Sequence, residues 1–256
     1  MRTGLAGATA AALLALTAGP AAAQAQVGVP GCPDDVAVRA SREPITFDSR
    51  GRSIRAHLYT PQGEANGVGV VLLHGGTGFE MNSILFDAHA IQLASRGYRV
   101  ILPAYFDAAA PDSSRRTVTA RAWRQVALDA AEALAAEPGM TRERVALWGY
   151  SRGAAVGVDA ATSPGSGVRT AILVAGGGSV DEDLSDRNLS VLMLHARRDE
   201  AVPVRSTLRL AEDLRTAGAA VQVQELAFDG HQYDLPTWCA AFAATRAFLE
   251  GRYGPA

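Results

Sequence analysis

The sequence predicts an α/β protein in which helices flank a mostly parallel central sheet. Segments typical of strands and of helices alternate along the chain, and this order favours parallel strands with helices on both faces. The run from Val68 to Leu73 is continuously apolar, as expected for a strand that is buried on both faces. Hydrophobic residues make up 48% of the 256 residues, which is enough for a sizeable core.

The predicted strands are short apolar runs, and the first two form a hairpin at an edge of the sheet. In chain order they are residues 45–49, 54–60, 68–73, 98–102, 145–148, 170–175, 190–195 and 221–227. The hairpin turns at Arg50–Arg52, and Pro103 stops the strand at 98–102. Ligands of such sheets bind beyond the carboxyl ends of the strands, so the residues just after each strand are where chemistry is expected.

The predicted helices are bounded by glycine and proline. They are residues 84–96, 121–136, a helix from 152, 204–217 and 237–251. Gly97 and Gly218 follow two of them, and Pro138–Gly139 ends another, because these residues terminate helices. Residues 104–120 are expected to form a polar loop that overhangs the carboxyl end of the sheet.

The N-terminal 25 residues predict a secretory signal peptide. Arg2 supplies a positive start, Leu5–Ala18 is an apolar core too short to anchor in a bilayer, and small residues follow Gly19–Pro20. We therefore expect a signal peptide at 1–25, an N-terminal extension at 26–43 and one catalytic domain at 44–256. The mature protein is expected in the periplasm or the medium of a bacterium, with no membrane association after cleavage.

The two cysteines fit an exported protein. In an oxidising compartment Cys32 and Cys239 are a disulfide candidate that would join the N-terminal extension to the last helix. The alternative is a lipid-modified Cys32, which the distance from the apolar core and Pro30 disfavour.

Composition excludes several chemistries. All 24 basic residues are arginine, so a pyridoxal-phosphate Schiff base, a phosphate-loop lysine and a serine–lysine dyad are excluded. The net charge of −2 gives no general attraction to nucleic acid. The two cysteines and five histidines show no close ligand spacing, so neither a metal nor a cofactor is expected.

A candidate nucleophile lies at Gly149–Gly153. Ser151 occupies the centre of this G-x-S-x-G pattern between a predicted strand and a predicted helix, where a sharp turn exposes the hydroxyl. The alternative is a serine that only caps the helix. A second motif, His74–Gly78, follows the strand at 68–73, and the backbone N–H groups of Gly76 and Arg152 are our candidates for an oxyanion hole. The alternative there is a glycine-rich turn with no donor role.

The candidate acid and base follow later strands. Asp199 comes after the strand at 190–195, and His231 comes after the last strand, so their order with Ser151 is that of nucleophile-elbow hydrolases. His231 would act as general base, and Asp199 would orient its ring. The rival acids are Glu200, Asp229 and Asp234. Structural roles are expected for the remaining histidines, namely His57, His74, His89 and His195.

The chain resembles the dienelactone hydrolase group of α/β-hydrolases from about Pro44 to Leu249. The resemblance rests on the runs HGGTG, ILFDAHAIQLASRGYRVILPAYFD, GYSRG, HARRDEAVP and GHQYD. It implies the α/β-hydrolase fold, and the short segment between the strands at 170–175 and 190–195 leaves no room for a large cap domain. Dienelactone hydrolases proper carry cysteine in the elbow, whereas this chain has Ser151. The wider family therefore implies a serine esterase or lactonase rather than an enzyme for dienelactone itself.

Substrate contacts are less sharply indicated. Tyr105 and Phe106 follow a strand and are candidates for lining an acyl pocket, although packing within the loop is an equal alternative. Arginines at the same end of the sheet would bind a substrate carboxylate, unless they are only solvated surface charge. These are Arg115, Arg116, Arg152, Arg197 and Arg198.

The sequence thus predicts a secreted serine hydrolase that cleaves small-molecule carboxylic esters or lactones. Two alternatives stay open. One is a small serine peptidase related to prolyl oligopeptidase, and the other is a catalytically silent binding protein with the hydrolase fold. The oligomeric state is not indicated.

Overall fold

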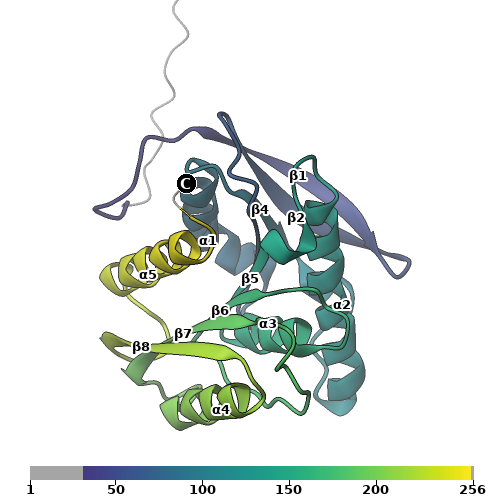
Figure 1. Ribbon diagram of the computed structural model, residues 1–256, viewed down its shortest axis with the longest axis vertical. Helices are drawn as coiled ribbons and strands as arrows, with labels where there is room; N and C mark the ends of the chain where they lie inside the picture. Colours follow the sequence, from purple (N-terminus) through teal and green to yellow (C-terminus); the bar gives the residue numbers. More distant parts are fainter. Residues whose placement is uncertain (1–30, 255–256) are drawn as a thin grey trace, which may run out of the picture.

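A computed structural model describes residues 31–254, without the side chains of residues 82–84 and 113. The predicted signal peptide at 1–25 lies outside the described residues, as does the beginning of the predicted extension at 26–43. One eight-stranded sheet in the described chain has the spatial order β1-β2-β4-β3-β5-β6-β7-β8 (Figure 1). The strands are β1 (Ala40–Ser49), β2 (Arg52–Pro61), β3 (Gly69–Leu73), β4 (Arg99–Pro103), β5 (Val145–Tyr150), β6 (Thr170–Val174), β7 (Ser190–Arg198) and β8 (Ala220–Asp229).

The pairing confirms the mostly parallel sheet and the edge hairpin. β1 pairs antiparallel with β2, and β2 pairs antiparallel with β4. From β4 through β3, β5, β6 and β7 to β8, each adjacent pair of strands is parallel. The carboxyl ends of β3, β5, β7 and β8 therefore lie at one edge of the sheet, where the predicted motifs follow them.

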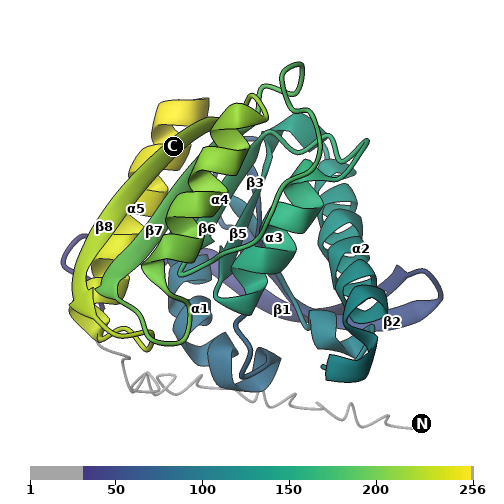
Figure 2. The same ribbon diagram turned by 90° about the horizontal axis from the view of Figure 1, so that it is seen from below.

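Helices cover both faces of the sheet (Figure 2). They are α1 (Phe79–Ala94), α2 (Arg116–Ala135), α3 (Arg152–Thr162), α4 (Val204–Thr216) and α5 (Leu235–Tyr253). One hydrophobic cluster joins the sheet to α2, α3 and α4, through residues such as Val126, Val156 and Leu210. A second joins the opposite face to α1 and α5, through residues such as Phe86 and Phe242.

Two helices begin earlier than the sequence predicts. α1 begins at Phe79, directly after Gly78, and α2 begins at Arg116 inside the predicted loop at 104–120. That loop also contains short 3-10 helices at Tyr105–Asp107 and Ser113–Arg115. The mostly exposed first turn of α2, Arg116–Thr119, carries only Val118 as an apolar residue, so periodicity gave no helix signal there. In α1 the glycine-rich segment before Phe79 obscured the start of the helix.

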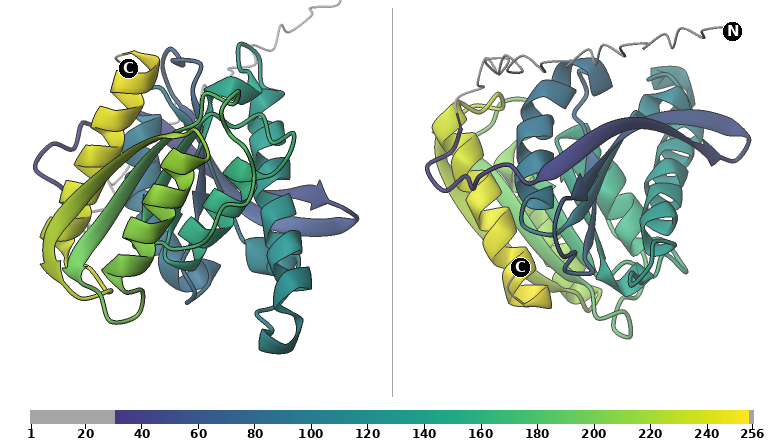
Figure 3. Two further views of the ribbon diagram at one scale, coloured as in Figure 1. Left: turned by 60° about the horizontal axis from the view of Figure 1, so that its bottom comes forward. Right: turned by 90° about the horizontal axis from the view of Figure 1, so that it is seen from above.

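The segment at 31–39, here called the N-terminal strap, crosses α1 and α5 (Figure 3). Cys32 and Cys239 form the predicted disulfide, and Asp34 forms an ion pair with the buried Arg246 of α5. The backbone N–H and C=O of Val36 both bond to the side-chain amide of Gln92, each at 2.9 Å. The strap is thus joined covalently to α5 and by hydrogen bonds to α1.

The carboxyl edge of the sheet has little above it. The segment between β6 and β7, residues 175–189, contains neither a helix nor a strand. This confirms that the described chain lacks a large cap domain. No helix in residues 31–254 combines the length and the apolar content needed to cross a bilayer.

Candidate active site

Ser151 lies on a strained turn between β5 and α3. Its backbone has φ 55° and ψ −116°, a conformation that side-chain-bearing residues rarely adopt and that costs about 1–3 kcal/mol. The turn is held because the N–H of Ser151 donates to the carbonyl of Val174 at 2.8 Å, while α3 begins at the next residue. The predicted sharp elbow is therefore present, with the serine side chain partly exposed.

The two glycines of the elbow allow its close packing. A Cβ atom on Gly149 would lie 2.2 Å from the carbonyl oxygen of Gly153. A Cβ atom on Gly153 would lie 2.1 Å from the carbonyl oxygen of Leu73, at the end of β3. Glycine at both positions lets α3 approach β3, and this brings Ser151 beside the His74–Gly78 segment.

The structure brings Ser151, His231 and Asp199 together in one hydrogen-bonded chain. The Oγ atom of Ser151 is 2.8 Å from Nε2 of His231, and Nδ1 of His231 is 2.7 Å from Oδ2 of Asp199. A carboxylate only accepts, so Nδ1 carries the proton and Nε2 is free to accept the serine proton. The side chain of Asp199 is fully buried, and that of His231 is 14% exposed, so the base remains accessible from solvent.

Two of the three rival acids have other partners, and the third is exposed. Asp229 pairs with Arg197 and Arg198, and Asp234 caps α5 by accepting from the N–H of Thr237. Glu200 is exposed. Of the four acids, Asp199 is the one that bonds to the His231 ring, and its second oxygen, Oδ1, accepts from two backbone N–H groups of the loop that follows it.

Tyr150 holds the segment that carries His231, which the sequence reasoning did not find. Its hydroxyl donates to the carbonyl of His231 at 2.6 Å, and the two rings stack with centroids 5.2 Å apart. The sequence signal for this contact was the position of Tyr150 directly before Ser151, because a side chain there lies near any residue that reaches Ser151.

The His74–Gly78 segment lies against the elbow from the side of β3. His74 is fully buried, its Nδ1 donates to the carbonyl of Gly75 at 2.9 Å, and burial lowers its pKa to about 4. It is therefore neutral and packs, as expected, rather than acting as a base. Gly76 faces the Arg152 side chain, since a Cβ atom on Gly76 would lie 3.4 Å from Nε of Arg152. The backbone N–H of Arg152 opens α3 and has no acceptor within the helix.

The two aromatic candidates have different environments. Tyr105 is fully buried, stacks on His74 with centroids 4.1 Å apart and donates to the carbonyl of His74 at 2.7 Å. Tyr105 therefore packs against the His74–Gly78 segment as a buried support. This corrects the prediction that Tyr105 lines a substrate pocket. Phe106 is partly exposed and lies near Gly78, so it alone stays a candidate for substrate contact.

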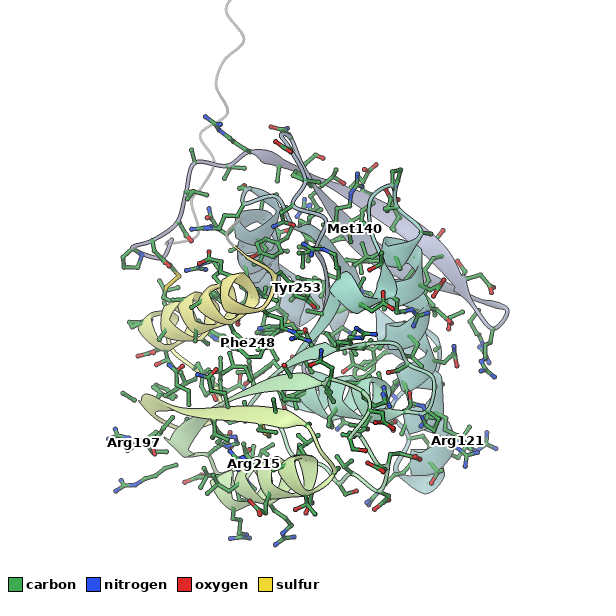
Figure 4. The ribbon with its side chains drawn as sticks, in the orientation of Figure 1. Arg121, Met140, Arg197, Arg215, Phe248 and Tyr253 are labelled. Atoms are coloured by element: carbon green, nitrogen blue, oxygen red, sulfur yellow. A yellow bond between two sulfur atoms is a disulfide. The ribbon has the colours of Figure 1, made fainter. Side chains whose placement is uncertain are left out.

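The five candidate arginines do not converge. Arg197 and Arg198 pair with Asp229, and Figure 4 shows Arg197 at the outer rim of the sheet. Arg115 lines a cavity of about 560 Å³ between the β1–β2 turn and α2, and Arg116 is exposed at the start of α2. Arg152 alone adjoins Ser151, with its exposed guanidinium 5.5 Å from the centroid of the Trp123 ring.

Known proteins share a sequence family and a fold with this chain. A family model described as "Dienelactone hydrolase family" matches residues 54–235, whereas no curated protein matches the chain. A putative dienelactone hydrolase from Klebsiella pneumoniae superposes with a TM-score of 0.65 and 16% identity, over 82% of this chain and 98% of that one. A cold-adapted esterase from an Arctic intertidal metagenomic library gives 0.60 and 22%, over 87% and 99%. An acylaminoacyl peptidase of Pyrococcus horikoshii gives 0.60 and 17%, over 83% of this chain and 41% of that one. At these identities the superpositions show the fold.

Proposed function

We propose, from the premise that this chain belongs to the dienelactone hydrolase family, that it is an exported serine hydrolase of carboxylic esters or lactones. The family supports a hydrolase of small-molecule esters. The finer proposal, an acyl-enzyme on Ser151, rests on one observation: the continuous contacts from Ser151 Oγ to His231 and from His231 to Asp199.

The proposed reaction has two halves, formation of the acyl-enzyme and its hydrolysis, and both use Ser151, His231 and Asp199. Ser151 attacks the ester carbonyl while its proton passes to Nε2 of His231, and Asp199 orients the ring and stabilises the resulting imidazolium. The N–H groups of Gly76 and Arg152 would stabilise the tetrahedral oxyanion. His231 then protonates the leaving alkoxide, and water, activated by the same ring, releases the acid from Ser151.

Export is part of the proposal. The sequence pattern at 1–25 is typical of a secretory signal, and the disulfide between Cys32 and Cys239 is of the kind that persists in oxidising compartments.

Peptidase activity is the second candidate, since an acylaminoacyl peptidase shares the fold. The ester proposal is preferred because the chain spans only 41% of that peptidase. A catalytically silent binding protein is disfavoured because Ser151, His231 and Asp199 are intact and in contact.

The test is labelling of the mature protein with a fluorophosphonate probe, followed by hydrolysis of p-nitrophenyl esters, lactones and aminoacyl anilides. We expect labelling of the wild type and of Ser179→Ala, an exposed serine used as a control, and none of Ser151→Ala. Labelling that survives in Ser151→Ala refutes the nucleophile. Faster turnover of anilides than of esters would identify the protein as a peptidase instead.

A further inference from the structure

A second histidine lies on the other side of the candidate acid. His195 belongs to β7, and its side chain is 2% exposed. Its Nε2 atom is 3.5 Å from Oδ2 of Asp199, the same oxygen that contacts His231. The buried carboxylate is therefore flanked by two imidazole rings, of which only His231 reaches Ser151.

The backbone of Val202 connects His195 to Asp199. The N–H of Val202 donates to Oδ1 of Asp199 at 2.8 Å, and the carbonyl of Val202 lies 2.9 Å from Nε2 of His195. A carbonyl oxygen only accepts, so Nε2 carries a proton. His195 thus bonds to the carbonyl of the same residue whose N–H donates to Asp199.

Thr207 fixes the opposite edge of the same ring. Its hydroxyl oxygen on α4 lies 2.6 Å from Nδ1 of His195 and also contacts the carbonyl of Gly176. Burial lowers the pKa of His195 and favours the neutral ring, in which Nδ1 is an acceptor. The single hydroxyl hydrogen of Thr207 is therefore shared between two acceptors, Nδ1 of His195 and the carbonyl of Gly176. Thr207 is fully buried, so water does not substitute for this contact.

His89 shows that burial alone does not create such contacts. It is as buried as His195, yet neither of its ring nitrogens has a hydrogen-bond partner among the described residues. Its ring only packs, stacking on Phe242 with centroids 4.0 Å apart. Both nitrogens of His195, in contrast, have a partner: Nε2 faces the carbonyl of Val202 in the loop after Asp199, and Nδ1 faces the hydroxyl of Thr207 on α4.

We propose that His195, fixed by Thr207, is a positioning residue for Asp199. It fixes the carbonyl, and with it the backbone, of Val202, so that Oδ1 of Asp199 stays bonded to the N–H of Val202 and Oδ2 faces His231. The proposal rests on the proposed function for its kinetic consequence, because a displaced Asp199 leaves His231 without its orienting partner. His195 itself does not touch the reacting atoms.

The kinetic test uses near-isosteric changes of Thr207. Thr207→Val removes the hydroxyl, and we expect kcat for p-nitrophenyl acetate to fall about tenfold per fluorophosphonate-titrated site, with KM unchanged within twofold. Thr207→Ser keeps the hydroxyl and is expected to restore kcat. His195→Gln should lower kcat about 10–100-fold. His89→Leu, the matched loss of a buried histidine, should leave kcat per titrated site unchanged.

A second readout does not depend on turnover. The Nδ1 proton of His231, shared with Asp199, gives a low-field proton resonance that we expect in the wild type and in Thr207→Ser, but shifted or lost in Thr207→Val. A wild-type kcat per site and an unshifted resonance in both Thr207→Val and His195→Gln would overturn the positioning role. A wild type that neither labels nor hydrolyses would refute the proposed function, while the resonance would still decide whether His195 positions Asp199.

Discussion

Replacing Gly153 by alanine should separate the nucleophile from the rest of the site. The added Cβ would lie 2.1 Å from the carbonyl oxygen of Leu73 and 2.6 Å from that of His74. Real Cβ atoms essentially never approach closer than 3.0 Å, and both contacts are with backbone, so neither can rotate away. Relief therefore requires α3 to move by roughly 1 Å away from β3.

That displacement sets the expected magnitude. A shift of about 1 Å in a catalytic geometry costs about 100-fold in rate, and we expect at least this loss in kcat/KM for p-nitrophenyl acetate. Overpacking of this kind costs about 1–3 kcal/mol, which lowers Tm by roughly 2–12 °C in a chain of this size. Stopped-flow or steady-state hydrolysis and scanning calorimetry measure the two effects.

Gly157→Ala is the matched control on the same helix. Its Cβ would lie 3.5 Å from Leu173 and 3.6 Å from Leu73, both side-chain contacts at ordinary van der Waals distance. Alanine also favours the helix by about 1 kcal/mol, so we expect wild-type activity and an equal or higher Tm. If Gly153→Ala kept kcat/KM within twofold and the wild-type Tm, the close approach of α3 to β3 would not be what places Ser151.

Three further predictions concern acid stability, the disulfide and substrate charge. Burial lowers the pKa of His89 well below 6.5, so the folded state disfavours protonation of its ring. The stability that depends on a neutral His89 is therefore fully present above pH 6.5 and is lost as the pH falls below it. His89→Leu should therefore narrow the difference between urea midpoints at pH 7.5 and pH 5, and an unchanged difference would contradict this. Replacing both Cys32 and Cys239 by serine should lower the free energy of unfolding by up to about 5 kcal/mol with little change in kcat, as measured by urea unfolding and ester hydrolysis. Equal stability of the two proteins would refute it. Arg152→Ala should reduce kcat/KM about tenfold more for esters that carry a carboxylate than for neutral esters of the same size, because Arg152 is the candidate cation beside Ser151. An unchanged preference would leave Arg152 as surface charge stacked on Trp123.

Much of the fold and the meeting of three candidate catalytic side chains could be predicted because the informative residues are local. Ser151, Asp199 and His231 each follow a recognisable strand, and the parallel order of those strands places them at one edge. Glycine and proline marked most helix ends for a similarly local reason, since they restrict the backbone at their own positions.

The unpredicted features depend on contacts between distant segments. The burial of Tyr105 follows from its hydroxyl reaching the carbonyl of His74, 31 residues away in the sequence. The clamp of Tyr150 on His231 spans 80 residues or more, and the contact of His195 with Thr207 depends on how α4 returns over β7. No periodicity or motif encodes such pairs, because each requires the relative placement of two elements.

The disulfide makes the backbone between residues 32 and 239 a closed covalent ring. One protease cut within that ring opens it without releasing a fragment, because both new pieces stay joined through the sulfur atoms. The exposed residues at 181–183, between β6 and β7, are a natural place for such a cut. Since Ser151 precedes this segment while Asp199 and His231 follow it, a nicked molecule keeps all three groups on one covalent body. The bridge thus gives the protein a tolerance to single cleavage that thiol reduction would remove.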